Sequence, residues 1–242
     1  MKNFLMIDTE TFGDLRYDAC GEKNLYEFGF TLVLKGQVSI TRAYLCRDSI
    51  EYAESVYDET GYFPTYFPDR IARDFDAYIA RAIDRINVAD VICRAIDYAR
   101  KNRIAIVAKN PAFDCAVLEK YMGFNLLDVS ECRDMQAMLV KALPKKYAFS
   151  VPHTSSGLAT FRADYLVPFM LGSDFVQEHD AGGDSLNQAL IVLKLAKRKQ
   201  GKSNSTQVFQ MMQEYHARLN IPLYSGTFTL PKNGRPKKVK KG

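Results

Sequence analysis

Hydrophobic residues near the start of the chain, and again near its middle, occur in short runs that predict β-strands. Residues 3–8 form an apolar run that ends in an acid, and two β-rich stretches at 25–34 and 38–46 are joined by the turn-prone residues 35–37. We expect three strands here, with the last two paired antiparallel. Residues 104–108 are apolar without interruption, which is typical of a strand buried on both faces.

In much of the remaining chain, apolar residues recur at the spacing of an α-helix. Residues 70–102 predict one or two amphipathic helices, and further helices are expected at 110–122, 134–143, 184–199 and 206–219. The periodic positions are Ile71, Phe75, Ile79, Ile83 and Ile86 in the first segment, and Leu186, Leu190 and Leu193 on one face of the helix at 184–199.

Residues 50–68 fit neither period. They are rich in Tyr and Phe, and Gly61, Pro64 and Pro68 interrupt them, so we expect an ordered but irregular loop. The rings at 57–68 could form a stacking platform for single-stranded nucleic acid or a satellite hydrophobic core, and the core is the favoured interpretation.

The order of the predicted elements favours one α/β domain followed by an extension. The strand near the middle of the chain leads directly into a helix, which is the signature of an α/β fold, and residues 126–133 could add a further strand. We divide the chain into a domain over 1–200, a linker with a helical extension over 201–231, and a basic tail, disordered in our expectation, over 232–242.

Composition and charge limit the classes of function. The chain has 242 residues, and no apolar run approaches the roughly 20 residues that cross a bilayer, so we expect a soluble, cytoplasmic protein without a membrane partner. Its five cysteines are odd in number and form no CxxC pair, which argues against a disulfide framework and a zinc site. The net charge of +5 is concentrated in the tail over 232–242, whose Lys and Arg residues should attract phosphates.

Acidic residues stand at predicted strand ends and helix starts: Asp8 and Glu10 after the first strand, Asp114 after the central strand, and Asp184 in a late helix. Because side chains alternate along a strand, Asp8 and Glu10 can point the same way and hold one cation. Carboxylate oxygens are the ligands that Mg²⁺ and Mn²⁺ prefer. The sequence therefore predicts two divalent ions at these four acids, as in two-metal phosphodiester hydrolysis. His179 precedes Asp184 by five residues and is a candidate general base.

Three motifs carry a resemblance to a known family. IDTET at 7–11, VAKNPAFD at 107–114 and HDAGGD at 179–184 resemble, in order, the motifs of the DEDDh (DnaQ-like) 3′→5′ exonucleases of the RNase H-like superfamily. YEFGF at 26–30 also resembles the family's second strand.

The resemblance implies an RNase H-like fold, a mixed five-stranded sheet flanked by helices, and release of nucleoside 5′-monophosphates from a 3′ end. It implies that Asp8, Glu10 and Asp184 hold one metal, that Asp8 also binds the second with support from Asp114, and that His179 deprotonates water.

Substrate contacts also follow from the resemblance. Thr11 and Phe12 occupy the region where relatives bind the terminal 3′ hydroxyl and stack the last base, so Phe12 is our candidate stacking wedge. Lys109 stands where relatives commonly have His before Asn110, and both residues are expected near the substrate, although Lys109 could instead extend along a strand end. Gly182 and Gly183 replace bulkier residues, so we expect the loop that carries His179 to be mobile and to close over substrate.

Several alternatives stay open. Single-stranded DNA is the favoured substrate because of the basic tail, whereas an exoribonuclease of the ribonuclease T or oligoribonuclease type is the runner-up. A non-catalytic nucleic-acid-binding module and an RNase H-like endonuclease are further hypotheses. A homodimer and a polymerase or replication partner are both compatible with the family. The remaining histidines, His153 and His216, are expected to be structural or surface residues.

Overall fold

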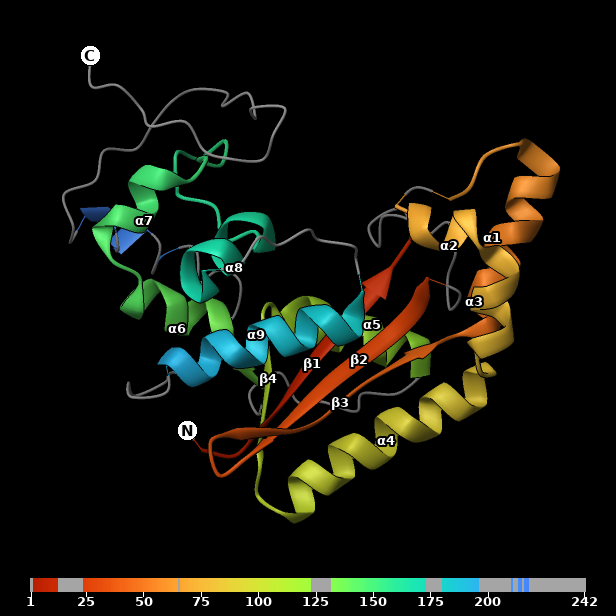
Figure 1. Cartoon of the computed structure of the whole chain (residues 1–242), viewed down its shortest axis with the longest axis horizontal. Helices are drawn as coiled ribbons and strands as arrows, with labels where there is room; N and C mark the ends of the chain where they lie inside the picture. The colour runs from red at the N-terminus through yellow and green to blue at the C-terminus, as the bar shows by residue number, and fades with distance from the viewer. Residues whose placement is uncertain are drawn as a thin grey trace.

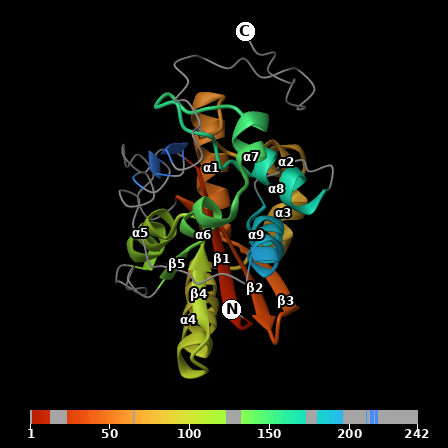
Figure 2. The same cartoon turned by 90° about the vertical axis from the view of Figure 1, so that its left-hand side faces the viewer.

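The computed structural model describes residues 2–12, 24–64, 66–122, 132–172 and 180–195, together with residues 210, 213, 214, 216 and 217. The centre of the molecule is a five-stranded sheet with strand order β3-β2-β1-β4-β5 (Figures 1 and 2). The strands are β1 (Phe4–Thr11), β2 (Leu25–Leu34), β3 (Gln37–Leu45), β4 (Ala105–Ala108) and β5 (Cys132–Asp134).

The sheet is mixed, as expected. β1 pairs antiparallel with β2 and parallel with β4, β2 pairs antiparallel with β3, and β4 pairs parallel with β5. The four strands predicted before residue 110 are therefore confirmed, and β5 confirms the end of the fifth, whose residues 126–131 lie outside the described part. β1 continues to Thr11, so Asp8 and Glu10 lie within the strand and not after it.

Helices cover both faces of the sheet. Along β1, Phe4 and Met6 face a core shared with α6, α8 and α9, whereas Leu5 and Ile7 face a core shared with α4 and α5. Figure 2 accordingly shows α5 and α9 on opposite sides of β1. The bounds are α1 (Arg47–Thr60), α2 (Asp69–Arg73), α3 (Phe75–Arg81), α4 (Arg85–Lys101), α5 (Pro111–Met122), α6 (Met135–Ala142), α7 (Lys145–Ser150), α8 (Ala163–Leu171) and α9 (Ala181–Leu195).

The prediction of an irregular loop over 50–68 is wrong for its first half, because α1 extends to Thr60. Gly61 ends this helix in the left-handed conformation (φ 76°), and its N–H is bonded to the carbonyl of Tyr57. The two prolines lie beyond the helix and so do not interrupt it. Gly61 therefore marks the end of a helix, whereas the sequence predicted that it lies within an irregular loop.

Aromatic residues after α1 pack into a third core at the end of the sheet, beside α1, α2 and α3 (Figure 1). Phe63 stacks on Tyr57 and on Phe67, with ring centroids 4.4 Å and 4.6 Å apart, and Phe67 meets Phe12 edge to face. The satellite-core interpretation is thus confirmed for Phe63 and Phe67.

Residues 70–102 form three helices in place of one or two. The chain breaks at Asp74 and again near Ile83, which makes an isolated bridge with Cys46. Ile86 is 77% exposed at the start of α4, so its assignment to the apolar face is wrong. The short helices α7 and α8 were not predicted, and α8 contains Pro168.

The predicted linker and basic tail lie outside the described residues, as does most of the predicted helix at 206–219. None of the helices in the described ranges is long and apolar enough to span a membrane.

Candidate metal centre

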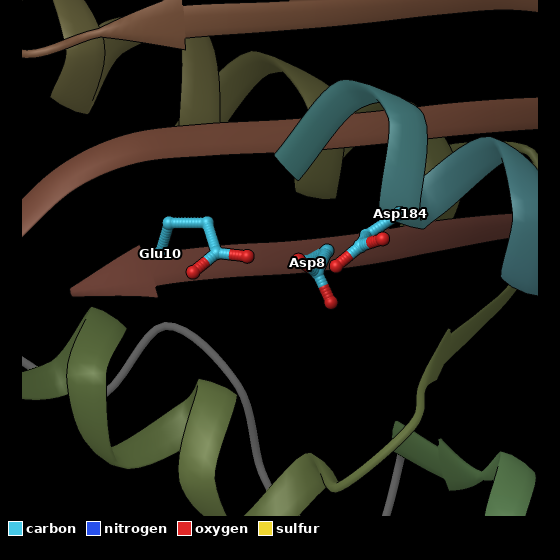
Figure 3. A group of neighbouring side chains, drawn as sticks. All are labelled: Asp8, Glu10 and Asp184. Carbon is cyan, nitrogen blue, oxygen red and sulfur yellow. The ribbon is translucent and has the colours of Figure 1, made fainter. Parts of the chain in front are cut away.

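Three carboxylates meet where β1 passes beneath the start of α9. Asp8 and Glu10, two residues apart, point to the face of the sheet that α9 covers, and Asp184 reaches them from the first turn of that helix (Figure 3). One carboxylate oxygen from each of these three residues lies within 4.8 Å of the corresponding oxygens of the other two. The structure therefore brings together three of the four acids that the sequence singled out.

The close approach of α9 to the sheet depends on two glycines. A Cβ at Gly29, which lies opposite Asp8 on β2, would come within 2.1 Å of the carbonyl oxygen of Ala181. A Cβ at Gly182 would lie 2.9 Å from that of Ala43 on β3. The absence of side chains at these positions lets the helix start lie directly on the sheet, which brings Asp184 to Asp8.

Gly182 and Gly183 belong to α9 and not to a loop, whereas the expected mobility concerns the segment that carries His179, which lies outside the described residues. Asp180 caps this helix: its Oδ1 accepts the N–H groups of Gly182 at 2.9 Å and Gly183 at 3.3 Å. The first turn of α9 is therefore fixed by side-chain hydrogen bonds. His179 itself lies outside the described residues, so its role stays a prediction.

The buried face of α9 near the acids is polar. Gln188 donates a hydrogen bond of 2.7 Å to Oδ1 of Asp8, and the hydroxyl of Ser185 lies 3.0 Å from that of Thr31 on β2. Leu190, which the sequence reading placed on the apolar face, is 37% exposed. That face assignment was wrong because the helix turns Asp184, Ser185 and Gln188 toward the sheet.

Gln188 is a site residue that sequence reasoning missed. It lies four positions after Asp184, a spacing that puts two side chains on the same face of a helix. This spacing could have identified it once Asp184 was recognised as a candidate ligand.

The environment of Asp8 raises the proton affinity of its carboxylate. Burial raises the pKa of Asp8 well above its ordinary value, and the charges of Asp114, Glu10 and Asp184 raise it further, while the hydrogen bond from Gln188 lowers it. Each cause except the last disfavours the ionised carboxylate. A divalent cation among these oxygens would reverse that balance, so the set of donors fits a metal site.

Asp114 lies on the other side of β1, in the first turn of α5. It is only 4% exposed, and Thr9 donates a hydrogen bond of 2.9 Å to its Oδ1. Burial raises its pKa to about 7, whereas hydrogen bonds from Thr9 lower it. The charge of Asp114 raises the pKa of Asp8, but Asp114 is not in the group of three acids within 4.8 Å, so its role as a metal ligand stays a prediction.

The candidate substrate residues lie around this centre in different environments. Thr11 is half-buried at the end of β1, Lys109 is half-buried, and Asn110 is exposed just before α5, where its carbonyl accepts the N–H groups of Phe113 and Asp114. Their proposed contacts with substrate are not tested by this arrangement.

Phe12 contradicts the stacking hypothesis in its present conformation. Its ring has no exposed surface, and it stacks at 5.9 Å on Tyr26 and at 6.3 Å on Tyr52. Partners from β2 and α1 occupy the faces that a base would need. Phe113, by contrast, is 37% exposed and directly precedes Asp114.

The two other histidines pack against each other. The rings of His153 and His216 pack edge to face with centroids 5.9 Å apart. His216 is 2% exposed, and its Nε2 accepts the N–H of Ala159 at 3.1 Å. The expectation that His216 is structural is confirmed.

No protein-family model and no curated protein matches the sequence. Among solved structures, the fold is similar to E. coli Exonuclease I in complex with a 5cy-dA13 oligonucleotide, with a TM-score of 0.54 and 15% identity. The match covers 87% of this chain and 42% of that protein, so the chain spans about two fifths of the length of Exonuclease I.

Two structures of a 3′-exonuclease are also similar. One, described as 3′-end specific recognition of histone mRNA stem-loop by 3′-exonuclease, has a TM-score of 0.47 and 14% identity, and the match covers 81% of this chain and 82% of that one. The other, the full-length 3′-exonuclease, has a TM-score of 0.48 and 13% identity over 97% and 95% of the two chains. The likeness to Exonuclease I establishes the fold: the chain has the α/β, RNase H-like architecture that the sequence predicted.

Proposed function

We propose that the protein is a metal-dependent 3′→5′ exonuclease that releases nucleoside 5′-monophosphates from nucleic acid. The observation that carries this proposal is the convergence of Asp8, Glu10 and Asp184 oxygens within 4.8 Å on an RNase H-like sheet. Carboxylates held close to one another raise the free energy of the metal-free protein, and such sites are typical of function.

Asp8, Glu10 and Asp184 would hold Mg²⁺ or Mn²⁺, with Asp114 supporting a second ion. Bound there, the two ions would supply the charge that activates water and stabilises the leaving 3′ oxygen. Gln188 holds one oxygen of Asp8 by its hydrogen bond, and Thr9 holds Asp114. Each acid would thus keep its orientation before the ions and substrate arrive.

His179 is the proposed general base, since it directly precedes the capping residue of the helix that carries Asp184. For the terminal base, Phe113 replaces Phe12 as the stacking candidate because its ring is partly exposed beside Asp114.

Single-stranded DNA is the proposed substrate, supported by the basic residues of 232–242. RNA is the alternative. A 2′ hydroxyl distinguishes the two substrates, so matched oligonucleotides of identical sequence separate them directly.

The experiment is digestion of 5′-labelled single-stranded DNA and RNA with Mg²⁺, with EDTA, and with the Asp8→Ala and His179→Ala variants. We expect a ladder of stepwise products that EDTA and Asp8→Ala abolish. A single internal cut would indicate an endonuclease. Intact substrate in every lane, with retained binding, would indicate a non-catalytic nucleic-acid-binding module.

A further inference from the structure

A buried carboxylate beside the metal centre has no part in the proposed chemistry. Glu27 lies on β2 directly opposite Glu10 on β1, and it is only 4% exposed. Residues directly opposite each other in an antiparallel pair present their side chains on the same face. Glu27 therefore lies on the face that α9 covers, next to the acids.

One oxygen of Glu27 joins two distant segments of the chain. Its Oε2 accepts a hydrogen bond of 2.6 Å from Nη2 of Arg70 in α2 and another of 3.2 Å from the N–H of Ala181, the first residue of α9. The Arg70 side chain is only 16% exposed, and its guanidinium carbon lies 5.4 Å from the centre of the Tyr78 ring. The arginine is itself held in place, so it can hold the carboxylate.

The bond to Ala181 fixes the part of α9 that matters for the site. Asp184 lies in the same first turn, three residues after Ala181, and His179 lies two residues before it. The first N–H groups of a helix have no partner within the helix, so an acceptor at this point determines where the helix begins. A carboxylate there also interacts favourably with the helix dipole.

We infer that Glu27, held by Arg70, is a positioning residue that fixes the start of α9 and hence the placement of Asp184 at the metal centre. This inference rests on the proposed function. The competing explanation is that the ion pair only attaches α2 to the sheet. The two differ in what happens when apolar side chains replace both ions.

The decisive variant is Glu27→Leu combined with Arg70→Met. Replacing a buried ion pair with apolar residues of similar size is often neutral or stabilising, so attachment of α2 should survive. The hydrogen bond to Ala181 is nevertheless lost. Arg73→Met is the matched control, because Arg73 lies in the same helix and pairs with Asp69 at 3.7 Å on the surface, where both side chains are at least 80% exposed.

Three quantities are measured on the full chain: binding of Mn²⁺ alone by calorimetry or electron paramagnetic resonance, kcat and KM on a 5′-labelled oligonucleotide, and Tm. We expect the double variant to keep a Tm close to that of the wild type, while Mn²⁺ affinity and kcat each fall about 10- to 100-fold, the usual effect of losing a partner that orients a metal ligand. KM should change less, and Arg73→Met should match the wild type throughout.

Wild-type Mn²⁺ affinity and kcat in the double variant would overturn the positioning role alone. If the double variant fails to fold, Glu27→Met decides, since it keeps a side chain of similar size but cannot accept the N–H of Ala181; an unchanged kcat and Mn²⁺ affinity there would also overturn it. A wild type that neither binds Mn²⁺ nor shortens the oligonucleotide would overturn the proposed function and this inference together.

Discussion

Two acidic regions lie side by side on β1 and β2, and the protein treats them in opposite ways. Glu27 meets the guanidinium of Arg70 at 2.6 Å, so the folded chain supplies its counter-charge. Asp8, one strand away, has three other carboxylates among the main causes of its raised pKa. The first arrangement resembles a structural ion pair, whereas the second concentrates charge of one sign.

This difference distinguishes a carboxylate that supports the fold, Glu27, from the carboxylates around Asp8, which would bind metal. A buried ion pair can in principle be exchanged for apolar side chains with little loss of stability. A group of like charges destabilises the protein that carries it, and natural proteins retain such conflicts mainly at functional sites. We therefore expect changes at Asp8 and at Glu27 to affect activity and stability in different proportions.

The largest expected effect is on turnover by Asp8→Asn. The amide keeps the shape and can still accept the hydrogen bond from Gln188, but it removes the charge that would bind the metal. Activity should fall by more than about 100-fold, the upper end for loss of a residue that only orients a ligand. Initial rates on a 5′-labelled oligonucleotide test this. Asp58→Asn, on the exposed side of α1, is the control, and a rate for Asp8→Asn within threefold of Glu27→Gln would contradict the distinction.

Gly29→Ala should damage both regions at once. Gly29 lies opposite Asp8 and two residues from Glu27, and its new methyl group would fall 2.1 Å from the carbonyl oxygen of Ala181. Because that neighbour is backbone, α9 must shift, and we expect a loss of about 1–3 kcal/mol of stability, as for other overpacked positions. Denaturant unfolding and nuclease rates measure the two losses.

Gly183→Ala is the matched control for this change. The nearest atom to its new methyl group is a side-chain oxygen of Asp180 at 3.5 Å, which is an ordinary contact. Equal losses of stability in the two alanine variants would show that the close approach of α9 to β2 does not account for the loss in Gly29→Ala.

Local patterns in the sequence predicted the parts of this site that depend on local geometry. Strand alternation predicted that Asp8 and Glu10 share one face, and the three motifs predicted that Asp184 lies beside them, as the structure shows. The contacts between distant segments were not predictable in this way. Arg70 and Glu27 are 43 positions apart in the sequence, and the spacing of apolar residues does not predict that they pair.

The errors have the same origin. Phe12 was expected to face substrate because it follows the acids, but rings from α1 and the segment after it cover it completely. In α9, leucines suggested the buried face, whereas the helix buries Asp184 and Gln188 against the sheet. Apolar periodicity locates a helix reliably, but at a functional site it does not show which side the helix buries.

Metal should stabilise the wild type and not Asp8→Asn. A ligand at about 100 times its Kd adds roughly 2.7 kcal/mol of stability, which corresponds to a rise in Tm of about 5–10 °C for a domain of this size. Calorimetry at pH 7.5 in Mn²⁺ and in EDTA measures the rise. The Glu27→Gln variant should retain part of it, because Asp8, Glu10 and Asp184 remain. An equal rise in Asp8→Asn would place the metal elsewhere.

The smallest expected effect is a pH dependence of stability in the metal-free protein. Since the pKa of Asp8 is raised on folding, the folded state binds its proton more tightly than the unfolded chain does, and the resulting stability is lost as the pH rises through the folded pKa. Asp114, with its pKa raised to about 7, adds to the same trend.

In EDTA, Asp8→Asn and the wild type should therefore have similar stability near pH 4, where the Asp8 carboxyl is protonated in the folded protein and neutral like the amide. As the pH rises toward 8, the wild type should become the less stable of the two by a few degrees in Tm, because about 1 kcal/mol shifts Tm by roughly 2–4 °C. Saturating Mg²⁺ should reverse the order at pH 8, since the cation offsets the repulsion that the amide removes. A wild type that stays the more stable protein in EDTA at every pH would mean that the carboxylates around Asp8 do not destabilise the metal-free fold.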